Sequence, residues 1–143
     1  MIFQDYCFSC SYSLSKYTKV SVLTSELIEP FVRRMAKNPK GRLTKADYAQ
    51  VTEINFSNKG IVNINPLSKF TSINNITLTE NAIIDLKPIA KLDQLVSLQV
   101  QSNHIKDLGP LSGLIQLERL NLSKNNITNI GPLKKLINLQ RLN

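Results

Sequence analysis

The sequence is poor in the residues that most often carry chemistry. It has no tryptophan, one histidine and two cysteines, and its five glycines are scattered rather than gathered in a phosphate-binding loop. The sequence pattern places no nucleophile and carboxylate beside the one histidine, His104. We therefore expect a protein that is not an enzyme and binds no cofactor.

The two cysteines, Cys7 and Cys10, form a C-x-x-C pair. A structural zinc ion normally takes four ligands, but no second pair exists and His104 is far along the chain. A redox motif needs a βαβ context, which is absent. We interpret the pair as incidental thiols and predict no metal. A dimer that pools two pairs, or an enzyme or metalloprotein built on this pair, is the alternative.

Long apolar runs are also absent. No stretch of about 18 apolar residues is present to span a membrane, and Met1 to Leu23 lack the pattern of a secretory signal. We expect a cytoplasmic protein, or an exported one if an upstream signal is missing. The net charge of +8 is spread along the chain without a block of one sign.

What the sequence does have is a period of 22 residues from Val51 to its end. The units are 51–72, 73–94, 95–116 and 117–138, with a partial fifth at 139–143. Proline recurs at Pro66, Pro88, Pro110 and Pro132. Apolar residues alternate at the start of each unit, as in Ile54-x-Phe56, which predicts one short strand per unit. The proline disfavours helix just before it, so a turn-rich or 3₁₀ return is expected.

The full frame, L-x-x-L-x-L-x-x-N-x-I-x-x-I-x-P-L-x-x-L, resembles the leucine-rich repeat family in the form found in internalin-like bacterial proteins. The resemblance covers residues 51–143. One unit cannot bury its apolar side chains alone, so the units must stack. The expected fold is an α/β solenoid: a right-handed leucine-rich repeat with short parallel strands on the concave face, a 3₁₀ or turn-rich convex side and a helical N-terminal cap.

Asparagine recurs where the chain leaves each strand, at Asn81, Asn103 and Asn125. We predict a buried asparagine ladder that bonds backbone groups there. The first unit departs from this pattern, because Asn58 stands one place early. Its turn is expected to rely on Gly60 for an unusual backbone angle, so that the ladder begins one unit late.

Residues 1–50 lack the period. We expect a poorly defined tail over 1–23, with a short strand near Val20 to Val22, and a helical cap over 24–50. The apolar residues of the first helix have helical spacing. They are Leu27, Ile28, Phe31, Val32 and Met35. Pro30 is best placed in a first turn, which predicts a start near Glu29.

A second helix is predicted from Lys45 to about Gln50, because Thr44 and Asp47 have the spacing of a capping box. The phrase from Leu43 to Asp47 resembles the L-T-x-A-D phrase before the repeats of many such bacterial proteins. A cap is needed to cover the first strand. The opposite end stops within a strand, so we interpret the chain as truncated and expect self-association through residues 139–143, unless a partner covers this edge.

Two repeated surface features bear on function. Lys69, Lys91 and Lys135 share one position on the convex side, which we interpret as a solvated face because no aromatic residues are interleaved for stacking bases. Four N-x-S/T triplets have the sequence of glycosylation sites. They begin at Asn55, Asn75, Asn121 and Asn126. We interpret these triplets as accidents of composition.

The strongest functional prediction is a polar concave surface for a protein partner of unknown identity. Its side chains lie in registered rows between the core columns. They are Glu53, Asn55, Ser57, Asn75, Thr77, Thr79, Ser97, Gln99, Gln101, Arg119, Asn121 and Ser123. The alternatives are a binder of nucleic acid or an anionic surface through the lysines, and a truncated structural fragment.

Overall fold

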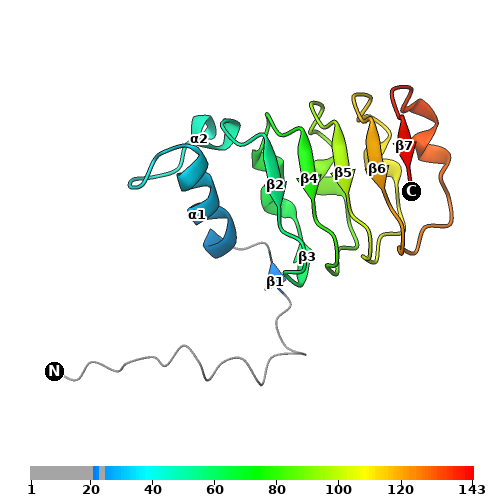
Figure 1. Ribbon diagram of the computed structural model, residues 1–143, viewed down its shortest axis with the longest axis horizontal. Helices are drawn as coiled ribbons and strands as arrows, with labels where there is room; N and C mark the ends of the chain where they lie inside the picture. Colours follow the sequence, from blue (N-terminus) through cyan, green and yellow to red (C-terminus); the bar gives the residue numbers. More distant parts are fainter. Residues whose placement is uncertain (1–20, 23–24) are drawn as a thin grey trace, which may run out of the picture.

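The computed structural model describes residues 21–22 and 25–143. Each unit forms one coil of a solenoid, and each coil gives one strand to a parallel sheet (Figure 1). The strands are β2 (Glu53–Asn55), β4 (Asn75–Thr77), β5 (Ser97–Gln99), β6 (Arg119–Asn121) and β7 (Arg141–Leu142). They follow one another in the order of the sequence, so each coil packs only against its neighbours.

The register of the sheet matches the sequence period. Ile54 pairs with Ile76, Ile76 with Leu98, and Leu98 with Leu120, so every residue lies beside its equivalent in the next coil. These strand residues are buried, as are the column through Leu67 and, apart from the half-buried Ile127, the column through Ile61. The predicted leucine-rich repeat solenoid is therefore confirmed, with one continuous core through the stacked coils.

The return limbs contain short 3₁₀ helices. They are η2 (Asn65–Lys69), η3 (Lys87–Ile89), η4 (Gly109–Leu111) and η5 (Gly131–Lys135). The recurring proline lies in the first turn of each, where its missing N–H needs no intrahelical acceptor. The expected 3₁₀ path is confirmed.

The asparagine ladder is also confirmed, with Asn81 and Asn103 buried and Asn125 half-buried. Asn103 shows the pattern: its Oδ1 accepts from the Ile83 N–H at 3.0 Å, and its Nδ2 donates to the carbonyls of Leu78 at 3.0 Å and Val100 at 2.9 Å. Asn81 and Asn125 bond in the same way. Each amide joins the backbone of its own coil to that of the preceding coil.

The first coil starts without a ladder asparagine, as expected. Asn81 compensates, because its Oδ1 accepts from the N–H groups of both Lys59 and Ile61, each at 3.0 Å. Gly60 has the predicted positive φ, of 64°. Asn58 occupies the turn position just before the ladder position, and its φ of 54° matches that of its equivalents in later coils. Those equivalents are Glu80, Ser102 and Lys124, each with φ 55°.

The cap contains helix α1 (Ser25–Met35), which begins earlier than predicted. Pro30 lies inside the helix rather than in its first turn, so the predicted start near Glu29 is wrong. The helix extends through the proline because its apolar face packs on the first coil. Ile28 and Val32 are buried in the common core, and this burial offsets the one backbone bond that proline removes.

The second helix, α2 (Lys45–Ala49), has the predicted capping box. The Thr44 N–H and hydroxyl both donate to Asp47 Oδ2 at 2.7 Å, and the Asp47 N–H donates to Thr44 Oγ1 at 3.3 Å. Tyr48 packs edge-on against Phe70 of the first coil, with ring centroids 5.3 Å apart. These contacts fix the cap to the solenoid.

A second, two-stranded sheet lies on the other side of the first coil. Strand β1 (Ser21–Val22) pairs in parallel with β3 (Ile61–Asn63), in agreement with the short strand expected near Val20 to Val22. Cys7, Cys10 and most of the expected tail lie outside the described residues, so those predictions are untested.

We expect the substitution Asn103→Ala to destabilise the protein strongly. It removes the acceptor for one buried N–H and the donor for two carbonyls, and each buried group left without a partner costs about 1–3 kcal/mol. Urea unfolding should show a loss of about 3 kcal/mol for Asn103→Ala. The exposed Asn126→Ala should change stability by less than about 0.5 kcal/mol. Equal effects would contradict the ladder's importance.

The capping box makes part of the stability depend on pH. The bonds from the Thr44 backbone and hydroxyl lower the pKa of Asp47 below its ordinary value of 3.8. The ionised cap therefore stabilises the fold fully above pH 3.8 and loses this effect as pH falls through the lower, folded pKa. In thermal melts, Asp47→Asn should lower Tm at neutral pH, with a difference from wild type that shrinks in acid. Asp93→Asn, at an exposed position, serves as the control.

Candidate protein-binding surface

The predicted concave residues form registered rows across the sheet. Asn55 lies beside Thr77, Thr77 beside Gln99, and Gln99 beside Asn121. Most of the predicted side chains are exposed or half-buried, because the alternation that buries Ile54 and its equivalents directs their neighbours outward. Ser97 is the exception. It is only 8% exposed and so offers little surface to a partner.

Hydrogen bonds hold several of these side chains in place. Asn55 Oδ1 accepts from the Ser57 N–H at 3.1 Å and from its hydroxyl at 2.8 Å, and Asn121 and Ser123 repeat both bonds. Asn121 Nδ2 also donates to Gln101 Oε1 in the neighbouring coil. Two of the N-x-S/T triplets are thus turn motifs at strand ends, a structural use of the sequence that composition alone did not indicate.

The charges on the surface are distributed unevenly. One row begins with Glu53 on β2 and ends with Arg119 and Arg141, which pair side by side in register on β6 and β7. Among the described residues the one ion pair is between Arg33 and Glu29, so both arginines are available to an external carboxylate. Arg141 is not among the residues predicted for this surface, because its unit is only a fragment.

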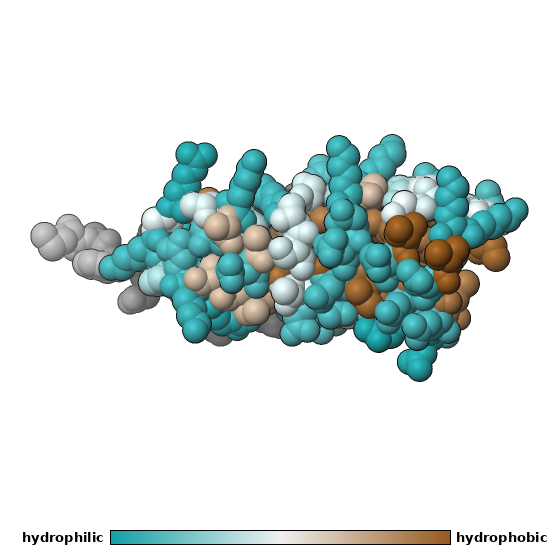
Figure 2. Space-filling view, turned by 90° about the horizontal axis from the view of Figure 1, so that it is seen from above, coloured by the Kyte–Doolittle hydropathy of each residue, from teal (hydrophilic) through white to brown (hydrophobic). Residues whose placement is uncertain are grey.

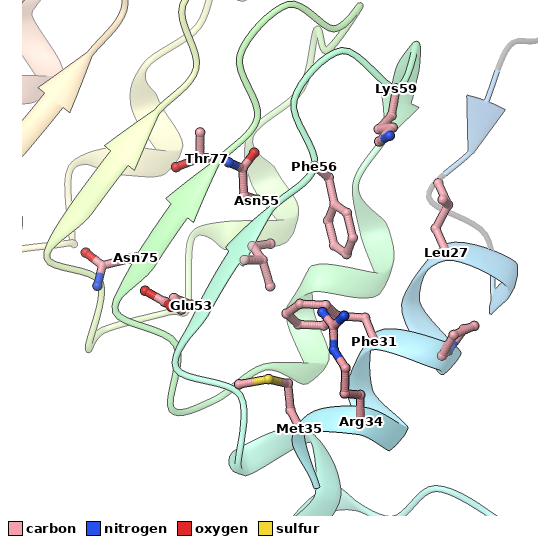
Figure 3. A pocket seen from close by; sticks show the side chains of 12 residues that line it. Leu27, Phe31, Arg34, Met35, Glu53, Asn55, Phe56, Lys59, Asn75 and Thr77 are labelled. Atoms are coloured by element: carbon pink, nitrogen blue, oxygen red, sulfur yellow. The ribbon is translucent and has the colours of Figure 1, made fainter. Parts of the chain in front are cut away.

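A groove lies at the N-terminal end of the sheet, between α1 and β2 (Figure 3). Its volume is about 740 Å³, within the range of about 300–1,000 Å³ typical of ligand pockets. The apolar and basic side chains of α1 form one wall, and polar side chains of β2 and β4 form the other. This groove could not be predicted from the sequence, because it depends on where α1 packs relative to the first strand.

The convex lysines are exposed, as expected. Lys69, Lys91 and Lys135 lie on or next to the 3₁₀ helices, and the Lys69 ammonium is 5.4 Å from the centre of the Tyr48 ring. Figure 2 shows polar side chains over most of one edge of the solenoid, with apolar ones gathered toward the β6–β7 end. Ile115 and Ile137 are exposed apolar residues of adjacent coils.

The described part of the chain has little that indicates catalysis. His104 is exposed at a turn, as predicted. Residues 21–22 and 25–143 contain no cluster of three side chains able to hold a metal ion, and none of their helices is long and apolar enough to cross a membrane.

Leu142, at the edge strand β7, is 47% exposed. Self-association through this edge stays a prediction.

Comparison with known proteins extends these observations. No family model and no curated protein matches the sequence. Among solved structures, an internalin from Listeria monocytogenes matches 81% of this chain and 35% of its own, with a TM-score of 0.74 and 24% identity. Internalin C2 from that species matches over 58% of this chain and 37% of its own, with a TM-score of 0.57 and 35% identity.

A third structure, the functional domain of InlJ from Listeria monocytogenes, matches over 70% of this chain and 22% of its own, with a TM-score of 0.60 and 26% identity. The chain therefore spans about a third or less of the length of these proteins. Their fold suggests a protein-interaction module. With its repeat frame, sheet register and asparagine ladder, the chain has the leucine-rich repeat fold and is similar to the internalins.

Proposed function

We propose that the protein is a non-enzymatic binding module that presents its concave sheet to a folded protein partner. The observation that carries the proposal is the preordered polar surface: outward side chains lie in registered rows and several are fixed by hydrogen bonds. A surface that is already ordered loses little conformational entropy when it binds. The similarity to leucine-rich repeat proteins supports the same type of function.

Arg119 and Arg141 are the side chains on this surface best suited to hold a partner. Arginine is enriched among residues that dominate binding energy, because its guanidinium makes several directed hydrogen bonds. The two arginines lie on adjacent strands, which are about 4.8 Å apart in a sheet. Two arginine side chains on adjacent strands favour a partner with a carboxylate-rich patch.

Capture of a protein partner by the immobilised chain should depend on the concave arginines. We expect Arg119→Glu to weaken capture by about tenfold or more, since it replaces an attractive charge with a repulsive one. Lys91→Glu makes the same charge change on the convex side and should leave capture unchanged. The measurement is the dissociation constant of the captured protein for the wild type, for Arg119→Glu and for Lys91→Glu.

Salt dependence separates this function from binding to nucleic acid. A protein bound by the concave face should be retained at moderate salt. Binding of a nucleic acid through the lysines would fall steeply with added salt, and Lys91→Glu would then be the damaging substitution. That pattern, with Arg119→Glu harmless, would refute the concave-face proposal.

A further inference from the structure

The edge of the sheet beside α1 offers backbone groups for pairing. β2 is the first strand of the sheet, and among the described strands it pairs only with β4. Its bonds to β4 use the Phe56 N–H, which donates to the Thr77 carbonyl at 2.9 Å, and the Thr52 carbonyl. In a parallel pair successive residues alternate sides, so Glu53 and Asn55 direct their N–H and C=O groups away from β4, toward α1.

The groove next to this edge combines apolar and basic side chains. Phe31 of α1 meets Phe56 edge-on, with ring centroids 5.5 Å apart, and Met35 is 38% exposed at the same wall. The Arg34 guanidinium carbon lies 5.5 Å from the centre of the Phe31 ring, and Lys59 stands at the other end of the groove (Figure 3).

The charge of the groove selects for an acidic occupant. Arg34 and Lys59 are both exposed, and Glu53 supplies the single carboxylate of the groove lining. Among the described residues, neither cation forms a salt bridge. Two unneutralised cations beside an open strand edge attract a segment that carries carboxylates.

We propose that the groove binds an extended, acidic peptide segment of a partner protein, which adds a strand to β2. The segment's backbone pairs with Glu53 and Asn55, an apolar side chain packs on Phe31 and Met35, and a carboxylate approaches Arg34 or Lys59. An extended peptide fits better than a helix, because only exposed backbone can use the N–H and C=O groups of the edge. This inference rests on the proposed function, since the groove lies at the end of the same surface.

Selection from a random heptapeptide display library tests the groove directly. The library is panned on the whole chain, with counter-selection on the double variant Arg34→Glu, Lys59→Glu. Enriched peptides should alternate apolar and acidic residues. The synthetic peptides should bind the double variant about tenfold more weakly than wild type. Lys87→Glu, Lys106→Glu, which reverses two exposed charges outside the groove, should bind as wild type does.

Backbone methylation of the peptide tests strand pairing. N-methylation at alternate residues blocks either the amides that face β2 or those that face away. One of the two patterns should abolish binding and the other should leave it nearly unchanged, whereas simple packing of side chains would make both patterns similar. Amide chemical shifts of the labelled protein should move in β2 and α1. Failure to enrich any peptide, or equal effects of both patterns, overturns the proposal.

The outcomes also distinguish this inference from the proposed function. In one outcome, the peptide changes the amide chemical shifts of the protein only in β5 and β6 and loses binding to Arg119→Glu. That result would leave the concave face as the site and refute the groove. Peptide binding in the groove, combined with a protein partner that is insensitive to Arg119→Glu, would refute the concave face and retain the groove.

Discussion

The buried asparagine amide is the interaction on which the rest of this solenoid depends. Where the chain leaves a strand it turns inward, and the N–H and C=O groups of the turn enter a core of mainly apolar side chains. Asn103 satisfies groups of this kind in two successive coils. Its amide can do so because it offers a donor and an acceptor without a charge to desolvate. The coils are thereby locked at a fixed register.

The register then determines the surface. Because Asn81, Asn103 and Asn125 hold equivalent atoms side by side, each outward residue lies next to its equivalent, and short polar side chains can bond between coils as Asn121 and Gln101 do. A slip of one residue would place the polar row in the core. The same constraint that buries the apolar columns therefore orders the candidate binding face.

The period in the sequence was sufficient to predict the coils, the ladder and the concave rows, because each of these repeats and each depends on neighbours at a fixed spacing. Features that occur once were harder. The early start of α1 could not be predicted from local signals, because the burial of Ile28 and Val32 offsets the local cost of Pro30. The turn role of Asn58 was missed because its equivalents are different residue types. The groove required knowledge of packing between non-repeating parts.

The surface and the groove differ in what they can contribute to binding. The rows on β4 and β5 are neutral and partly bonded to one another, so they favour shape matching over strong attachment. Apolar anchors and cations lie on either side of these rows: Phe31 and Arg34 beside β2, and Arg119 with Arg141 on β6 and β7. A partner that contacts both groups must carry matching groups at the same separation. For such a partner, the spacing along the solenoid determines specificity, and this spacing is set by the number of coils between the two groups.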